Sequence, residues 1–324
     1  MKAVHRKDRK DRKTQQKEYE MEFRKLANGV EIPALIMGTY PLKNEAMDTA
    51  VDAALKAGFR GFDTAHNYGN EDSLGNSLAK SLPEYGLSRE DIFIETKIGE
   101  TLVNGIPDRK TLTRAGNQEK DVAAIVDSFV EESCTKLRTD YLDLLMIHWP
   151  HPDYFTDIWK ELEKIYRKGT VRAIGLSNCR EWHLRRLVDS GSDIFPMVNQ
   201  IEHHPYNSQR GIVEVCRELD IQVEAYSPLM KCRKGSKTLS RIAASHHKTV
   251  AQVVLRWNIQ LGIIPLPKSG NPERIRENSE VFDFRLLPEE MAAIDLLNTD
   301  DVYLEPELYC PGFSRFKHEE ENGK

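Results

Sequence analysis

The chain has 324 residues, of which 40% are hydrophobic and 30% charged, and its net charge is −5 at pH 7. This length is enough for one large α/β domain or two small ones. The negative net charge gives no reason to expect nucleic-acid binding. No apolar run reaches the roughly 18 residues of a membrane helix. The five scattered cysteines lack metal-ligand spacing, and the N-terminus lacks the apolar core of a signal peptide, so reduced thiols and a cytoplasmic location are expected.

The first residues, 1–20, form a charged extension that contains the repeat RKDRKDRK. A basic run can indicate a nucleic-acid or membrane arm, but the aspartates within it favour a solvated, disordered terminus. Residues 21–324 are expected to form a single domain with a C-terminal tail. At its start, Phe23–Leu26 and Val30–Ile32 flank Asn28-Gly29, a strong hairpin signal, so an N-terminal β-hairpin is predicted to plug the bottom of the domain.

Short apolar runs then alternate with segments whose apolar residues keep the period of a helix, such as 122–137, 158–165 and 250–257. Eight runs are predicted as buried strands: Ala34–Gly38, Gly61–Asp63, Ile92–Lys97, Leu142–His148, Val171–Ser177, Met197–Glu202, Gln222–Tyr226 and Ile263–Pro267. Eight strands alternating with helices over about 250 residues predict an α/β fold, a (β/α)8 TIM barrel. A doubly wound sheet is the alternative, but the first strand is followed by GTYPLKNE, which lacks that fold's GxGxxG phosphate loop.

Polar side chains stand at the ends of three predicted strands. The second strand ends at Asp63, with Tyr68 shortly after it, and the third and fourth end at Lys97 and His148. In a barrel all these ends meet on one rim, where catalytic groups usually lie. The rim would therefore hold a carboxylate, a phenol, an ammonium and an imidazole. Each alone also has a structural interpretation, as an ordinary ion pair, a packed tyrosine or a histidine that closes a strand.

These residues lie in segments that resemble, in order, the motifs of the aldo-keto reductase family: FDTAHNYGNE, ETK, LLMIHWP, GLSN, AYSPL and PLPKSGNPERIREN. The resemblance is to the single-domain bacterial type and covers nearly everything from residue 21 to about residue 297. It implies an NADP-dependent enzyme that reduces the carbonyl of an aldehyde or ketone to an alcohol by hydride transfer. The family's catalytic tetrad falls on Asp63, Tyr68, Lys97 and His148.

The chemistry of these four groups suits that role. Hydride addition to a carbonyl leaves an alkoxide that needs a proton, and a tyrosine with the ordinary pKa of about 10 still holds one at neutral pH. Tyr68 is therefore the predicted general acid. We expect Lys97 to lower the pKa of the phenol, Asp63 to hold Lys97 in place, and His148 to orient the substrate oxygen as a neutral imidazole.

The resemblance also implies NADPH as the coenzyme. Ser177, Asn178 and Gln200 would bond the nicotinamide carboxamide, and Tyr226 would stack on its ring. The other implied contacts are Ser227 and Leu229 at the pyrophosphate, and Lys268, Ser269, Gly270, Arg274, Glu277 and Asn278 at the adenosine end. A lysine, a hydroxyl and an arginine near a helix N-terminus make an anion site, which favours the 2′-phosphate of NADPH over NADH. Each group also has an alternative role. Asn178 and Gln200 could cap strand ends, Tyr226 could be a core residue, and Arg274 could lie at a solvated helix start.

The substrate pocket is predicted from loops at the same rim. Tyr40 and Trp149 favour an apolar or flat carbonyl compound, whereas His66 and Asn67 make part of the wall polar. The segment Gly99–Gln118 is longer than a simple barrel connection needs, so it is either a lid or a surface insertion. In the family the C-terminal tail, here Asp301–Phe313, often shapes the pocket.

The loop after the seventh strand, Met230–Lys237, reads MKCRKGSK and contains no acidic residue. In many relatives an acid in this loop pairs with the lysine after strand eight and closes the loop over the pyrophosphate. Here the corresponding lysine is Lys268, and basic side chains would repel it. We therefore expect no closed belt and quick release of NADP+. The loop is either an electrostatic collar that touches the phosphates or an exposed segment without coenzyme contact.

Two other function classes stay open. One is a coenzyme-binding regulatory protein on the reductase fold, against which the presence of all four tetrad residues argues. The other is a metal-dependent barrel hydrolase using histidines such as His66, His203 and His204. No HxH ends the first strand, however, and adjacent side chains diverge in an extended segment. We expect no metal, a small carbonyl compound as the ligand, and a monomer or weak dimer.

Overall fold

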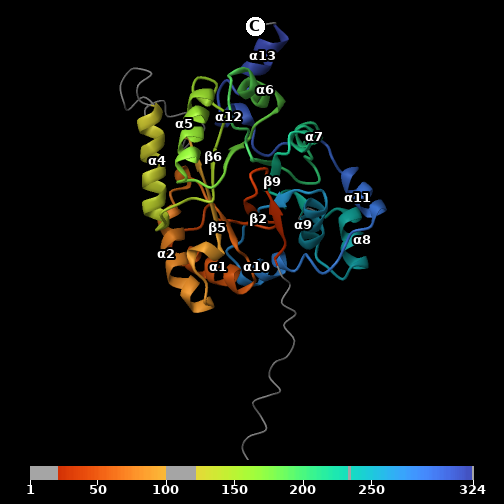
Figure 1. Cartoon of the computed structure of the whole chain (residues 1–324). Coiled ribbons are helices and arrows are strands. Elements are labelled where there is room, and N and C mark those ends of the chain that lie inside the picture. The colour runs from red at the N-terminus through yellow and green to blue at the C-terminus, as the bar shows by residue number, and fades with distance from the viewer. Residues whose placement is uncertain (1–20, 100–121, 233–234, 323–324) are drawn as a thin grey trace, which may run out of the picture.

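The computed structural model describes residues 21–99, 122–232 and 235–322 (Figure 1). The predicted N-terminal extension, nearly all of Gly99–Gln118 and two residues of the loop after the seventh strand lie outside these ranges. The expectations for those segments, including a lid or a surface insertion, therefore stay predictions, as does the single domain.

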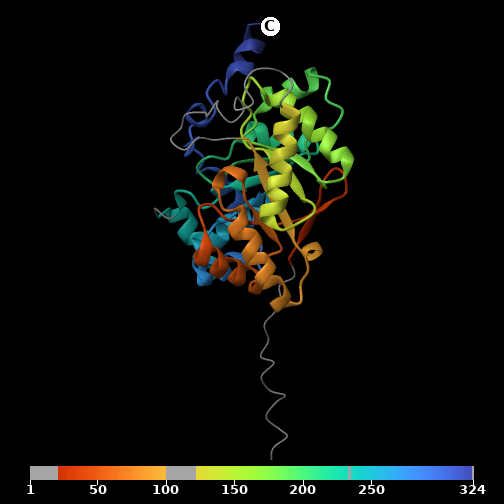
Figure 2. The same cartoon turned by 90° about the vertical axis from the view of Figure 1, so that its left-hand side faces the viewer.

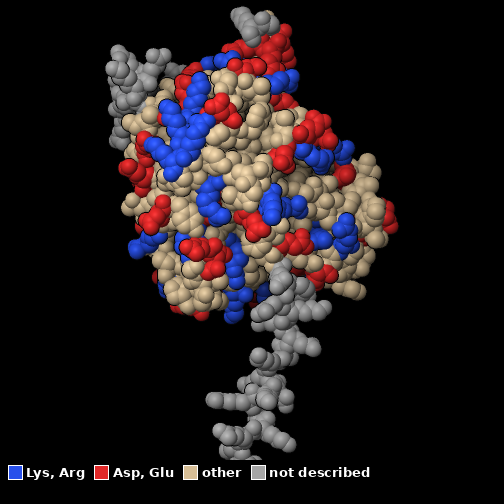
Figure 3. Space-filling view, in the orientation of Figure 1, with Lys and Arg blue, Asp and Glu red and all other residues tan. Residues whose placement is uncertain are grey.

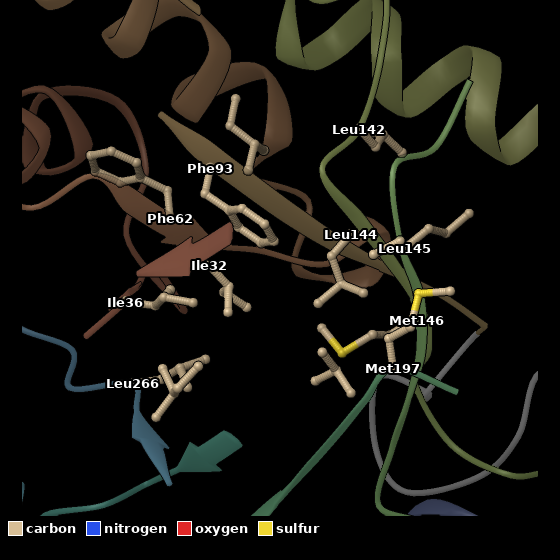
Figure 4. Packing of buried hydrophobic residues seen from close by; sticks show 14 of the residues in the cluster. Ile32, Ile36, Phe62, Phe93, Leu142, Leu144, Leu145, Met146, Met197 and Leu266 are labelled. Atoms are coloured by element: carbon tan, nitrogen blue, oxygen red, sulfur yellow. The ribbon is translucent and has the colours of Figure 1, made fainter. Parts of the chain in front are cut away.

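The predicted N-terminal hairpin is present. Strands β1 (Phe23–Lys25) and β2 (Glu31–Pro33) pair antiparallel, and Gly29 takes the positive φ of +85° that the turn between them requires. Ile32 of β2 is fully buried and lies among residues such as Ile36 and Leu144, which belong to the amino ends of the barrel strands (Figure 4). The hairpin therefore covers the amino end of the barrel.

Eight parallel strands follow one another in the sheet in the order of the chain. They are β3 (Met37–Gly38), β4 (Gly61–Asp63), β5 (Phe93–Ile98), β6 (Leu144–Ile147), β7 (Ile174–Ser177), β8 (Val198–Glu202), β9 (Gln222–Tyr226) and β10 (Ile264–Pro265). Each overlaps a strand predicted from the sequence. Because strands buried on both faces read as continuous apolar runs, their positions could be found without the structure.

The first and last strands are joined by backbone hydrogen bonds, which closes the sheet into a barrel. The N–H of Ile36 donates to the carbonyl of Pro265 at 3.3 Å, and the N–H of Gly38 donates to that of Pro267 at 3.2 Å. A Cβ at Gly38 would lie 3.2 Å from the carbonyl oxygen of Leu266, so glycine lets the two strands approach each other. This arrangement confirms the predicted (β/α)8 barrel.

Helices surround the strands, as Figures 1 and 2 show. Those between the strands are α1 (Asn44–Lys56), α2 (Glu71–Ser81), α4 (Val122–Leu137), α5 (Phe155–Lys168), α6 (Glu181–Asp189), α7 (Arg210–Glu218), α8 (Lys237–Ser245) and α9 (Val250–Gln260). After β10 come α10 (Pro272–Ser279), α11 (Pro288–Asp295), α12 (Pro306–Tyr309) and α13 (Arg315–Glu321). Short 3₁₀ helices among the described residues include η1 (His66–Tyr68), η2 (Leu82–Tyr85) and η3 (Arg89–Asp91).

Helix α9 illustrates how local sequence sets a helix boundary. The hydroxyl of Thr249 accepts a hydrogen bond from the N–H of Gln252 at 3.2 Å, and the Gln252 side chain accepts one from the N–H of Thr249 at 2.9 Å. This reciprocal cap is worth about 1 kcal/mol and starts the helix at Val250. Val253 and Trp257, one helical turn apart, are both fully buried.

On the face drawn in Figure 3, basic and acidic side chains occur side by side over most of the surface, with one larger group of basic side chains at the upper left. Among the helices of the described residues, none has the length and apolar character needed to cross a membrane. The expected cytoplasmic location and oligomeric state stay predictions.

Candidate active site

The four predicted catalytic side chains come from neighbouring strand ends. Asp63 is the last residue of β4, Lys97 lies in β5, His148 follows β6 directly, and Tyr68 ends the short helix η1 after β4. The ammonium of Lys97 donates hydrogen bonds to the carboxylate of Asp63 and, at 2.9 Å, to the carbonyl of Thr64. It lies 5.3 Å from the centroid of the Tyr68 ring. The Tyr68 and His148 ring centroids are 5.6 Å apart, so the four groups form one cluster.

Lys97 is an ammonium held inside the protein, with 1% of its surface exposed. Burial by itself lowers its pKa, but the negative charge of Asp63 outweighs this effect and raises the pKa above its ordinary value. Lys97 therefore stays protonated at neutral pH. Because removing one partner of a buried ion pair leaves an uncompensated charge, Asp63 and Lys97 depend on each other.

The Tyr68 phenol differs from the sequence-based expectation in one respect. Loss of contact with water raises its pKa to about 12; Lys97 opposes that rise and Asp63 adds to it. The effect of Lys97 thus has the predicted sign, but burial outweighs it. Tyr68 consequently holds its proton throughout the neutral range and is available as an acid.

The imidazole of His148 is neutral, as predicted. Burial, with a smaller contribution from Lys97, lowers its pKa well below 6.5. Its Nδ1 atom is enclosed and has no hydrogen-bond partner among the described residues. Its backbone is fixed, since its N–H donates to the carbonyl of Ile98 at 2.9 Å and its carbonyl accepts from Asn178 at 3.0 Å.

The η1 loop that presents Tyr68 is held by Asn70, a residue that sequence reasoning did not single out. The Asn70 amide donates to the hydroxyl of Thr39 at 3.2 Å and to the carbonyl of Leu42 at 3.1 Å, and it accepts from the hydroxyl of Thr64 at 2.7 Å. It is buried, and it ties the ends of β3 and β4 together. Asn70 directly precedes α2, and asparagine side chains at such positions often bond the backbone.

The residues predicted to contact the nicotinamide lie at the ends of three adjacent strands, β7, β8 and β9. Ser177 of β7 pairs in register with Gln200 of β8, and its hydroxyl donates to the Gln200 carbonyl at 3.0 Å. Asn178 donates to the Ser177 hydroxyl at 3.1 Å and accepts from the hydroxyl of Tyr226 at 2.8 Å. Ser177, Asn178 and Tyr226 therefore form one hydrogen-bonded group at the rim.

The Gln200 side chain points into the barrel. Its amide nitrogen lies 3.1 Å from Asp63, 3.2 Å from Glu95 and 2.9 Å from Glu224. Sequence reasoning missed the two glutamates, although strand alternation places Glu95 on the same face as Lys97 and Glu224 on the same face as Tyr226. Charged residues inside otherwise apolar strands were the available signal.

The predicted adenosine-binding residues surround the start of α10. Lys268 and Arg274 are exposed, whereas Ser269 and Asn278 are buried. The helix is capped by Asn271, whose side chain accepts from the N–H of Arg274 at 3.0 Å. Glu277, a predicted adenine contact, accepts a hydrogen bond from the hydroxyl of Thr249 at 2.7 Å.

The residues predicted for the substrate pocket separate into two groups. Tyr40 is 59% exposed and its ring lies 4.9 Å from that of Tyr68. Trp149 stacks on Tyr309 of the C-terminal tail, with ring centroids 5.5 Å apart. His66 instead faces α4, where it lies 3.1 Å from Glu132 and packs edge-on against the ring of Phe129. Asn67 follows it in η1 and is half-buried.

The C-terminal tail is anchored above the strand ends by Glu202, the last residue of β8. The carboxylate of Glu202 accepts from the backbone N–H groups of Tyr303 at 2.8 Å and Leu304 at 2.9 Å. Farther along, Phe313 packs with Cys310 and Trp149 in a small apolar cluster. The tail therefore packs against Trp149, the residue that follows His148 in the chain.

The histidines considered for metal binding have other partners. His203 stacks on Trp257 at 4.9 Å and bonds Asn258 at 2.7 Å, whereas His204 bonds Glu202 at 3.1 Å. The two side chains thus diverge. In the described ranges, no three His, Cys, Asp or Glu side chains are grouped so as to hold a metal ion.

Part of the loop after β9 is described. Ser227 and Lys231 adopt positive φ angles, Leu229 is half-buried, and Lys231 forms an ion pair with Asp301 of the tail. Arg233 and Lys234 lie outside the described residues, so the collar stays a prediction.

Comparisons with known proteins agree with this geometry. A model of the aldo/keto reductase family matches residues 34–299. The chain is 40% identical to the glyoxal reductase of Bacillus subtilis (strain 168) over 280 residues, which is 86% of this chain and 93% of that protein. It is 35% identical to the methylglyoxal reductase DkgA of Escherichia coli O157:H7 over 279 residues, 85% of this chain and 92% of that protein. The crystal structure of a Bombyx mori aldo-keto reductase in complex with NADP is 32% identical, with a TM-score of 0.76 over 89% of this chain and 96% of that one.

Proposed function

Because the chain belongs to the aldo/keto reductase family, we propose that it is an NADPH-dependent oxidoreductase that reduces the carbonyl of a small aldehyde or ketone to an alcohol. The observation that supports this most directly is the contact of Lys97 with both Asp63 and the ring of Tyr68 at the strand ends. It gives a protonated phenol a permanent positive charge beside it, which is what a proton donor to an alkoxide needs.

The side chains at the rim fit a nicotinamide coenzyme. Ser177, Asn178 and Gln200 offer both hydrogen-bond donors and acceptors next to the aromatic ring of Tyr226. The exposed side chains of Lys268 and Arg274 lie beside the start of α10 and have no ion-pair partner among the described residues, so they are available to a phosphate. When bound, NADPH supplies the hydride.

Tyr68 supplies the proton. With a pKa of about 12 it is fully protonated at neutral pH, and the alkoxide that it protonates is more basic still. Lys97 stabilises the phenolate that remains, and Asp63 keeps the Lys97 ammonium in place. His148, being neutral, orients the carbonyl oxygen by hydrogen bonding. Acid catalysis of this kind typically contributes about 10²- to 10⁴-fold.

The favoured substrates of this proposed reductase are small α-oxoaldehydes such as glyoxal and methylglyoxal. Two relatives at 35–40% identity are named for these compounds. Aromatic rings flank the catalytic cluster, with Tyr40 beside Tyr68 and Trp149 stacked on Tyr309, and they favour a small carbonyl over a bulky one.

The test is NADPH oxidation over a panel of carbonyl compounds, comparing the wild-type protein with Tyr68→Phe. The variant should lose at least about a hundredfold in kcat while its NADPH dissociation constant stays within about twofold, because only the proton-donating hydroxyl is removed. Tyr85→Phe is the matched control, since its hydroxyl bonds Asp52 at 2.7 Å in another part of the protein. Retained turnover in Tyr68→Phe would refute the assignment of the acid. Absence of NADPH-dependent turnover in the wild type would refute the function.

A further inference from the structure

Three carboxyl groups converge on one amide nitrogen inside the barrel. The nitrogen of Gln200 lies within 3.2 Å of oxygens of Asp63, Glu95 and Glu224. Glu95 and Glu224 are fully buried, and they belong to β5 and β9. An NH2 group has only two hydrogens, so it cannot satisfy three carboxylates equally.

The charges in this cluster do not balance if every carboxyl group is ionised. Among the described residues, the charged and titratable groups that interact with the two glutamates are Asp63 on β4, Lys97 on β5 and Tyr68 on η1. Lys97 is the one cation among them and is bonded to Asp63. Two further anions would then lie side by side out of water, which is costly without a partner.

A proton shared between Glu95 and Glu224 resolves the imbalance. Oε2 of Glu95 and Oε1 of Glu224 are enclosed oxygens without a hydrogen-bond partner in the described residues, and a carboxyl proton gives the pair the missing donor. Burial, followed by the charge of Glu224, raises the pKa of Glu95 well above its ordinary value. Burial likewise raises the pKa of Glu224 to about 7, against the hydrogen bond from Gln200, which lowers it.

This pair determines how the Gln200 amide is oriented. Carboxyl oxygens that lack a proton can only accept, so they select the NH2 end of the amide. The other end, Oε1, accepts no hydrogen bond from the described residues. Gln200 therefore presents an acceptor to a ligand, and an acceptor suits the N–H of a carboxamide.

We propose that Glu95 and Glu224 are positioning residues that share one proton, fix the amide of Gln200 and thereby hold the carboxamide of the coenzyme. The proposal rests on the proposed function, in which Gln200 contacts that carboxamide. It also predicts a response to pH. When the shared proton is lost, a new negative charge appears beneath the nicotinamide site. That charge favours the positively charged ring of NADP+ over the neutral ring of NADPH.

The first experiment measures the dissociation constants of NADPH and NADP+ by fluorescence titration at pH 6 and pH 8. Their ratio is the readout, because the titration of the 2′-phosphate common to both coenzymes cancels. In the wild type the ratio of NADPH to NADP+ dissociation constants should rise severalfold with pH. Glu224→Gln, which keeps an acceptor but cannot share the proton, should show a flat ratio and wild-type NADPH affinity at pH 6.

Glu224→Leu removes the acceptor and should weaken NADPH at both pH values by about two- to tenfold, the range expected for one lost hydrogen bond. The control is Glu163→Gln, which should behave as wild type. Glu163 is a buried glutamate of α5 whose carboxylate accepts a hydrogen bond from the N–H of Ile194 at 3.0 Å. If the leucine variant does not fold, Glu95→Gln replaces it and should also flatten the ratio. A wild-type pH dependence in Glu224→Gln, or wild-type affinity in Glu224→Leu, would overturn the proposal.

Infrared difference spectroscopy between pH 6 and pH 8 tests the shared proton without coenzyme. The wild type should lose the carbonyl band of a buried carboxylic acid as pH rises, and Glu224→Gln should lack that change. An identical spectrum in both proteins would refute the shared proton. A wild type that binds no NADPH but shows the band would refute the proposed function and the positioning role, while leaving the proton pair established.

Discussion

Replacing Glu224 with glutamine should change how the stability of the protein depends on pH. The pKa of Glu224 in the folded protein is about 7, raised from 4.5 mainly by burial. A carboxyl group whose pKa is raised by folding contributes stability that is fully present below about pH 4.5, and this contribution is lost as pH rises through about 7. Glutamine does not titrate, so the variant should not lose this contribution to stability as the pH rises.

The size of the effect can be worked out from the same two pKa values. A rise from 4.5 to about 7 corresponds to about 3 kcal/mol in the free energy of unfolding, at roughly 1.4 kcal/mol per pKa unit. Relative to wild type, Glu224→Gln should therefore gain about 3 kcal/mol between pH 4.5 and pH 8.

The assay is equilibrium unfolding in urea at half-unit steps across that range, with reversibility checked by refolding. Glu163→Gln provides the control for loss of a buried carboxyl elsewhere, and should keep the wild-type pH dependence. Stability curves of the wild type and Glu224→Gln that run parallel from pH 4.5 to pH 8 would refute the reasoning, because they would mean that Glu224 titrates alike in the folded and unfolded chains.

Two further predictions concern the coenzyme. Arg274→Ala should reduce the preference for NADPH over NADH by about tenfold or more, since a hydrogen bond to a charged group contributes about 1.5–3 kcal/mol; equal weakening of both coenzymes, measured by fluorescence titration, would exclude Arg274 as the 2′-phosphate ligand. If the loop after β9 is an electrostatic collar, NADPH affinity should fall steeply with salt, and changing Lys231, Arg233 and Lys234 to serine should flatten that dependence. Asp301→Asn is the control for the loss of the ion pair between Lys231 and the tail. A slow closing step in stopped-flow binding of NADPH, unchanged in the triple variant, would contradict the collar and favour a closed belt.

The barrel and the identity of its catalytic end could be predicted from the sequence alone, because both depend on short-range patterns. Buried parallel strands are continuous apolar runs, and the rule that their carboxyl ends share a rim places residues such as Asp63, Lys97 and His148 together without any coordinates. The hairpin was predictable for a similar reason, since Asn28-Gly29 supplies the backbone conformation of its turn. The assignment of individual roles drew on the resemblance to the family.

The tertiary structure decided what depends on which side chains share a space and how much water reaches them. His66 faces α4, and Glu202 ties down the tail through backbone N–H groups, which side-chain patterns do not reveal. Lys97 was expected to lower the pKa of Tyr68, but burial outweighs it and raises that pKa to about 12. Glu95 and Glu224, far apart in the chain, meet at Gln200 only because the barrel closes and turns alternate side chains inward. The burial of a side chain, and the meeting of side chains from distant strands inside a closed barrel, are properties of the folded state. A local sequence pattern therefore does not predict them.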